Sequence, residues 1–220
     1  MQYIQTLQQN WGISEELANT LLETGVIRSV AKDTMIALQG DVSHSLLFPL
    51  NGVVGLYRDT FEGKQQFSGL FSVGNIINDM YLFEKNGSHR TYLKSLEPCT
   101  ALKISFNDAK KLLAKNIEFT NLIARSLGNK SRAGSLIIYI IHEKDTLLKT
   151  ANAIRFVHEV CNLLEMPMTI EQLASFLSMS RNTVGNAMKK LKNMDIIDNK
   201  NGCIIIKNKQ ELINLCQSQM

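Results

Sequence analysis

The feature that most constrains the fold is a series of short apolar segments between about residues 27 and 105. Turn residues separate these segments about every ten residues: Gly40-Asp41, Asn51-Gly52, Glu62-Gly63-Lys64, Gly74-Asn75, Asn86-Gly87 and Glu97-Pro98. Short strands with regular turn signals are typical of an all-β barrel or roll. The sequence therefore predicts a β-roll, whose interior is a natural place for a small ligand.

A long helix is predicted after the roll, at residues 116–149, because this stretch has no proline and its apolar residues recur at helical spacing. Its three- and four-residue spacing resembles a coiled-coil seam, from which we predict a dimer interface. The predicted interface residues are Leu127, Gly134, Ile138 and Ile141. Burial of the whole helix within one domain remains an alternative, because the apolar residues cover more than one face.

A helix-turn-helix pattern occupies residues 169–192. Thr169 and Gln172 fit a capping box at the start of the first helix, and Ser180 is placed to cap the second. Val184, Met188 and Leu191 form the inward face of the second helix. Asn201-Gly202, between two short apolar runs, then predicts a type I′ hairpin that would form a wing up to residue 207.

The outward face of the second helix carries the side chains that read DNA in this motif. Arginine pairs with guanine, asparagine with adenine, and lysine or threonine with phosphate. The predicted DNA-binding residues are Thr169, Ser180, Arg181, Asn182, Thr183, Asn186, Lys189 and Lys190. A small helical subdomain that binds protein instead of DNA is the alternative.

Charge and composition agree with these predictions without deciding between them. The net charge is +4, and residues 169–220 hold seven basic side chains against four acidic ones, as expected for a phosphate-binding surface. We find no apolar window long enough to span a membrane and no secretory signal, so we expect a cytoplasmic protein without membrane contact. The four cysteines are scattered, which predicts neither a metal site nor a disulfide framework.

The string SRNTVGNAMKKL, at residues 180–191, resembles the recognition helix of the cyclic-AMP receptor protein and fumarate–nitrate regulator (CRP/FNR) family of bacterial transcription factors. The order of β-roll, long helix and winged helix-turn-helix resembles the same family over nearly the whole chain. The resemblance implies that Arg181 contacts base edges, whereas Asn182 and Asn186 stand where the family usually has Glu and Arg. It also implies a homodimer on a palindromic operator and contact with RNA polymerase.

The resemblance also implies an effector site in the roll. Its residues would be Asn78, Asp79, Met80, Arg90, Thr91, Ile137 and Ile138. A guanidinium and a hydroxyl at Arg90 and Thr91 suit an anion, and Ile137-Ile138 would give the site an apolar wall. We therefore expect an anionic, partly apolar effector rather than cyclic AMP. No iron–sulfur cluster is expected, because no cysteine precedes Cys99.

Taken together, the sequence predicts an α+β chain of three parts: a β-roll sensor domain with N-terminal helices at 1–115, a dimerisation helix at 116–149 and a winged helix-turn-helix domain at 150–220. The predicted function is effector-controlled, sequence-specific binding of double-stranded DNA. No motif of a nucleophile elbow, phosphate loop or zinc protease is present, so we do not expect an enzyme. A cyclic-nucleotide-binding-like subunit that acts through protein partners is the alternative.

Overall fold

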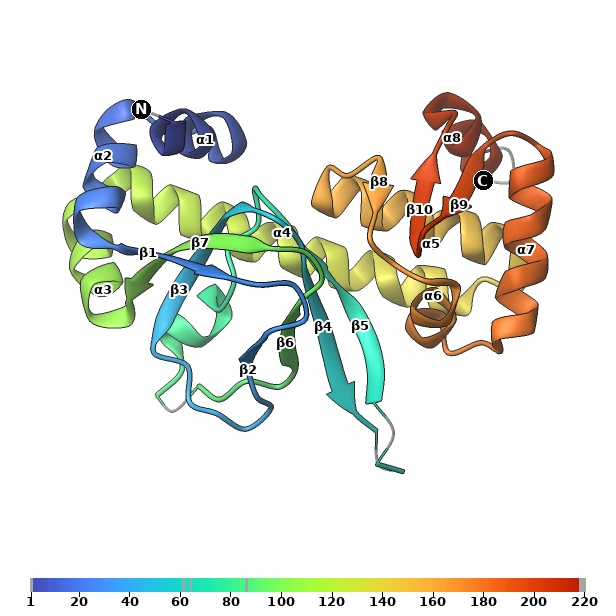
Figure 1. Cartoon of the computed structure of the whole chain (residues 1–220). Coiled ribbons are helices and arrows are strands. Elements are labelled where there is room, and N and C mark those ends of the chain that lie inside the picture. The colour runs from blue at the N-terminus through green and yellow to red at the C-terminus, as the bar shows by residue number, and fades with distance from the viewer. Residues whose placement is uncertain (1, 61, 64, 86, 218–220) are drawn as a thin grey trace. The chain divides into compact units, whose positions relative to one another are not determined.

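The computed structural model describes residues 2–217 apart from 61, 64 and 86, so Lys64 and Asn86, which belong to two predicted turns, lie outside the described residues. The chain is α+β and divides into two compact units, drawn in Figure 1. One unit comprises Met1–Arg58 and Leu70–Ser131, and the other comprises Asp59–Gly69 and Arg132–Met220.

The β-roll is built from two sheets. One sheet has the order β1 (Val26–Val30), β7 (Cys99–Ser105), β3 (Ser45–Asn51). The other has the order β2 (Met35–Ala37), β6 (Tyr92–Ser95), β4 (Val54–Asp59), β5 (Gln65–Phe71). The predicted β-roll is thus confirmed.

Helices cover one face of the β1–β7–β3 sheet (Figure 1). They are α1 (Gln2–Trp11), α2 (Glu15–Thr24), α3 (Phe106–Lys115) and the first part of α4 (Ile117–His142). Alternate strand residues, such as Leu46 and Phe48 of β3, point into this core because successive side chains of a strand face opposite ways. Between α2 and α4, the backbone N–H and hydroxyl of Ser14 each donate to the Glu118 carboxylate at 2.6 Å.

One predicted turn glycine is required by both conformation and space. Gly52 has a φ of 77°, and a β-carbon there would lie 2.5 Å from the carbonyl oxygen of Pro98 and 2.6 Å from the Cys99 sulfur. Gly40 also has a positive φ, of 94°, but a β-carbon there would meet nothing within 4 Å. The two positions therefore need glycine for different reasons.

The long helix is shorter than predicted, because α4 ends at His142 rather than at Lys149. Asp145 is the reason: its carboxylate accepts a hydrogen bond from the backbone N–H of Leu148 at 2.9 Å and so caps a new helix, α5 (Thr146–Cys161). Asp145 is a charged residue in the otherwise apolar spacing of the helix, and aspartate is also a helix start signal.

The second unit contains the predicted winged helix-turn-helix (Figure 1). After α5 come β8 (Glu165–Met166), α6 (Ile170–Leu177) and α7 (Arg181–Asn193), then β9 (Ile197–Lys200), β10 (Cys203–Ile206) and α8 (Lys209–Gln217). The three strands form one antiparallel sheet in the order β8–β10–β9. The two-residue strand β8 pairs with β10 and was not among the predicted elements.

Candidate nucleic-acid interface

The start of each helix in the α6–α7 pair is fixed by its capping residue. The hydroxyl of Thr169 accepts from the backbone N–H of Gln172 at 3.2 Å, and the Gln172 side chain accepts from the backbone N–H of Thr169 at 2.7 Å. Ser180 caps α7 by accepting from the backbone N–H of Thr183 at 3.1 Å. Thr169 and Ser180 therefore set the helix starts, which positions the face of α7 that the sequence predicts to bind DNA.

The inward and outward faces of α7 are arranged as the sequence predicts. Val184, Met188 and Leu191 are buried. Within α7, five of the predicted DNA-binding side chains are exposed: Arg181, Asn182, Asn186, Lys189 and Lys190. Thr183 is half-buried, and its hydroxyl lies 2.8 Å from that of Ser180. Thr183 therefore contacts the capping residue of α7 and is also partly exposed on the helix surface.

The N-terminal half of α7 borders a hollow of about 370 Å³. Its lining residues are Ile170, Arg181, Asn182, Gly185 and Asn186. Four of these five belong to α7, and Ile170 is the first residue of α6. The hollow therefore lies beside the end of the helix that enters the major groove in this motif.

The charges on this surface are only partly neutralised within the protein. The guanidinium of Arg181 donates to the carboxylate of Glu171 on α6, and this contact lowers the pKa of Glu171. Lys189 and Lys190 form no ion pair with any other residue in the described part of the chain. Two free cations beside an arginine give the surface the positive charge that phosphate binding requires.

The wing is tied to the C-terminal half of α7 by one carboxylate. Asp198 of β9 lies 2.6 Å from the ammonium of Lys192 and 3.2 Å from that of Lys200. The hydrogen bond from Lys192 is the main cause that holds the pKa of Asp198 well below its usual range. At the tip, Asn201 and Gly202 have φ values of 53° and 76°, as the predicted type I′ turn requires.

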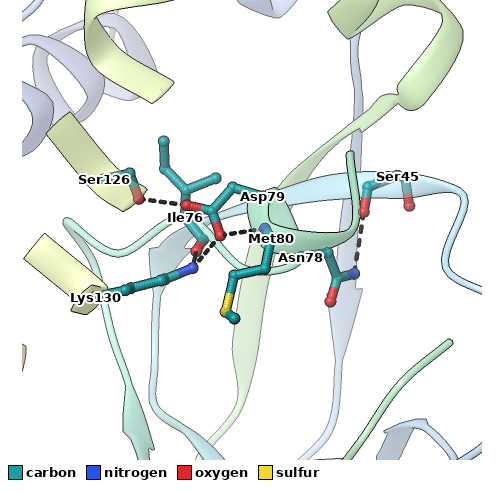
Figure 2. Close-up of polar contacts among 7 residues, drawn as sticks. All are labelled: Ser45, Ile76, Asn78, Asp79, Met80, Ser126 and Lys130. Carbon is teal, nitrogen blue, oxygen red and sulfur yellow. Dashed lines mark hydrogen bonds and ion pairs between the residues drawn. The ribbon is translucent and has the colours of Figure 1, made fainter. Parts of the chain in front are cut away.

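The predicted effector residue Asp79 is completely buried in a polar cluster shown in Figure 2. It begins the short helix η1 (Asp79–Phe83), and its carboxylate accepts from Ser126 Oγ of α4 at 2.6 Å and from the Lys130 ammonium. The backbone N–H of Met80 donates to the same carboxylate at 3.0 Å. Three donors thus surround the acid that the family resemblance assigns to an effector.

Lys130 is the other half of this ion pair and was not among the predicted site residues. Its side chain is 21% exposed, and its ammonium also donates to the carbonyl of Ile76 at 2.6 Å. Burial lowers the pKa of Lys130, and the neighbouring Asp79 carboxylate opposes that shift. The sequence signal for the cluster is Ser126 and Lys130, two polar residues four apart on the helix face that meets η1.

The other predicted effector residues differ in their exposure and in their contacts. Asn78 donates to the carbonyl of Ser45 at 3.0 Å, and Met80 is largely exposed. The Arg90 side chain is 74% exposed and pairs with Glu84 at 3.4 Å. Thr91 is half-buried. On α4, Ile137 is half-buried and Ile138 is 62% exposed.

A cavity of about 450 Å³ lies within the roll. Its apolar wall includes Ile36, Leu47 and Ile77, and its polar lining includes Asn78 and His89. Burial lowers the pKa of His89, whereas the nearby Asp41 carboxylate acts in the opposite direction. His89 appears in the sequence as an isolated histidine, so only the fold reveals that it lines a cavity.

The predicted dimer residues differ in their exposure. Gly134, Ile138 and Ile141 are exposed, and Leu136 and Tyr139 add further exposed apolar surface to the same helix. Leu127 is half-buried against the core of its own unit. Most of the predicted seam is thus apolar surface that this single chain leaves uncovered.

Among the described residues, no three His, Cys, Asp or Glu side chains cluster closely enough to hold a metal ion. No helix in the same part of the chain has both the length and the apolar character needed to cross a membrane.

Each of the two domains matches a known protein family. Residues 27–116 match the cyclic nucleotide-binding domain, and residues 145–215 match the Crp-like helix-turn-helix domain. The cAMP-activated global transcriptional regulator CRP of Pasteurella multocida is 23% identical over 192 residues, covering 80% of this chain and 87% of that protein.

Solved structures show the same fold. FixK2 of Bradyrhizobium japonicum superimposes with a TM-score of 0.73 at 16% identity, covering 87% of this chain and 96% of that one. A CRP-family transcriptional regulator of Thermus thermophilus gives a TM-score of 0.67 at 14% identity, covering 86% and 96%.

The β-roll and the winged helix-turn-helix together define a class of protein, the transcription regulators that combine a cyclic-nucleotide-binding-like domain with a DNA-binding domain. The chain belongs to the CRP/FNR family of bacterial transcription regulators.

Proposed function

We propose that this regulator binds a palindromic operator as a homodimer, and that a small effector in the β-roll changes its affinity for DNA. The observation that carries the proposal is the exposed face of α7, where Arg181, Asn182 and Asn186 stand beside the unpaired Lys189 and Lys190. Lysine and arginine supply phosphate contacts, and arginine and asparagine supply contacts to base edges. The chain acts by binding rather than by catalysis.

Dimerisation is supported by the apolar surface of α4. Gly134, Ile138 and Ile141 share one face of the helix and would be covered if two copies paired about a two-fold axis. Such an axis would place the two α7 helices about one turn of DNA apart, roughly 34 Å, and would explain a palindromic site. We further propose that the dimer, once bound to DNA, contacts RNA polymerase.

The effector in this proposal is an anionic, partly apolar molecule rather than cyclic AMP. The relative from Pasteurella multocida is named as cAMP-activated. In this chain Asp79 is already bonded to Lys130, Ser126 and the Met80 backbone, which leaves the acid poorly placed to receive a ribose hydroxyl. The cavity in the roll has the volume of a small-molecule site.

The DNA-binding proposal is tested by selecting sites from a random pool of duplexes with the purified full-length chain at two salt concentrations. We expect enrichment of a palindrome with half-sites about 10 base pairs apart and a steep loss of affinity with salt. Enrichment of no sequence would contradict the proposal and would favour a module that docks on protein.

Arg181→Ala tests the assignment of α7 as the recognition helix. We expect a loss of about 1–3 kcal/mol in specific binding and a relaxed base preference at one position of each half-site. The measurement is a titration of the selected operator by fluorescence anisotropy. Normal operator binding by the variant would show that another element reads the DNA.

Arg90→Ala tests the proposed anion contact. With the selected operator in hand, cyclic AMP and a panel of aromatic carboxylates are screened for an effect on DNA affinity. We expect the variant to bind DNA as the unchanged protein does and to lose the response to the active compound. An unchanged response would remove Arg90 from the effector site.

A further inference from the structure

Asn182 and Asn186 form a pair of free carboxamides on the exposed face of α7. They are four residues apart, so one lies above the other, one helical turn along. Both side chains are exposed, and neither makes a hydrogen bond with any other residue that the structure describes. Each carboxamide therefore keeps its donor and its acceptor available for a partner outside the protein.

Gly185 keeps the space beside these carboxamides open. A β-carbon at Gly185 would meet nothing within 4 Å, and its φ is not in the left-handed region. Neither the backbone nor the packing of this chain therefore requires glycine, which costs about 1 kcal/mol in a helix interior. The missing side chain instead adds clearance to the hollow lined by Asn182, Asn186 and Arg181.

The chemistry of the hollow matches one base pair better than the others. A carboxamide offers one donor and one acceptor side by side, which fits the N7 acceptor and N6 amino donor of adenine. Guanine presents two acceptors there and cytosine presents a donor, so neither pairs with both ends of the amide. Ile170 supplies apolar surface in the same hollow, which suits the methyl group of thymine.

We propose that Asn182 and Asn186 each read an adenine, so that every operator half-site carries two A·T pairs beside a guanine read by Arg181. Four residues advance an α-helix by about 6 Å, and base pairs are spaced by about 3.4 Å, so the two adenines lie within about two base steps of each other. The proposal rests on the DNA-binding function proposed above and specifies the sequence that it recognises.

The test measures the affinity of the full-length chain for the selected operator with each of the four bases placed in turn at every half-site position. The variants are Asn182→Ala and Asn186→Ala, with Lys189→Ala as a matched control on the same exposed helix face. Their melting temperatures confirm that each variant is folded.

For the unchanged chain we expect A·T to be preferred about 5- to 150-fold at two positions of each half-site. Each Asn→Ala variant is expected to lose that preference at one position and keep it at the other. Lys189→Ala is expected to weaken binding to all sequences by a similar factor and to reduce the salt slope by about one, because it removes a phosphate contact.

A double variant tests whether the base preference of the half-site can be changed by changing these two side chains. Glutamate accepts from cytosine and arginine pairs with guanine, so Asn182→Glu with Asn186→Arg is expected to change the preference at these positions from A·T to G·C. A wild-type preference for G·C there, or a base preference that the Asn variants leave unchanged, would overturn this inference while the DNA-binding function stands. The absence of any base preference at any position would overturn the proposed function itself.

Discussion

At the scale of single residues, the least expected feature is Asp79, a predicted effector residue whose carboxylate has no exposed surface. It persists in the interior because Lys130, Ser126 and a backbone N–H all donate to it. A buried charge without such partners would be strongly unfavourable. The ion pair therefore holds η1 against α4 within the first unit.

Lys130→Met is expected to lower the free energy of unfolding by about 3–5 kcal/mol, because it leaves the buried Asp79 charge without its counter-ion. Combining it with Asp79→Leu should restore much of that loss, since the uncompensated charge is then gone. Chemical denaturation measures both variants. Lys110→Met, at an exposed lysine of α3, is the control and should change stability by no more than about 0.5 kcal/mol. Equal effects of the two lysine variants would show that the pair does not stabilise the roll.

His89 predicts a pH dependence of stability. Because burial lowers its pKa in the folded state, the unfolded chain binds the proton more readily. This contribution is fully present above the ordinary histidine pKa of 6.5, and it is lost as the pH falls from there toward the lowered folded value. His89→Gln should flatten the stability profile over this range, as measured by denaturation at a series of pH values. His142→Gln, at an exposed histidine, is the control and should leave the dependence of stability on pH unchanged. If that dependence remains in His89→Gln, other groups cause it.

At the scale of the elements, the turn glycines give a matched pair of variants. Both Gly52→Ala and Gly40→Ala force alanine into a left-handed conformation, at about 1–2 kcal/mol. Only Gly52→Ala also drives a β-carbon into the backbone at Pro98 and the Cys99 sulfur, which adds about 1–3 kcal/mol. Thermal denaturation should therefore show the larger loss for Gly52→Ala, and equal losses would contradict the packing argument.

The elements also show what the sequence does and does not predict. The α6–α7 pair and the wing are predictable because local signals define them: a capping box at Thr169 and a type I′ dipeptide at Asn201-Gly202. The end of α4 is harder to predict from the sequence, because Asp145 lies after one helix and caps the next. The Asp79–Lys130 pair joins residues 51 apart in the chain, so the sequence can show the polar pair Ser126 and Lys130 on the helix but not the carboxylate that they bind. The same holds for Arg181 and Glu171, whose contact depends on how α6 crosses α7.

At the scale of the whole molecule, the proposed DNA binding requires that two chains pair through α4. Ile138→Asp places a charge on a residue that is 62% exposed in the single chain, so it should leave the fold intact and weaken only a dimer. We expect a shift toward monomer in sedimentation velocity and a loss of operator affinity. Ile117→Asp is the control at an exposed residue of the same helix outside the predicted seam, and it should remain dimeric. Dimers that persist in Ile138→Asp would place the interface elsewhere.

The central claim, that two recognition helices of one dimer read two half-sites on one face of DNA, is tested most directly by changing the distance between the half-sites. The measurement compares affinity for the selected palindrome with affinity for the same half-sites separated by five further base pairs, which turns one half-site to the opposite face. We expect the longer spacing to lower the affinity to nearly that of a single half-site. Equal affinity for the two duplexes would rule out the proposed dimer geometry, because the two half-sites would then be read independently.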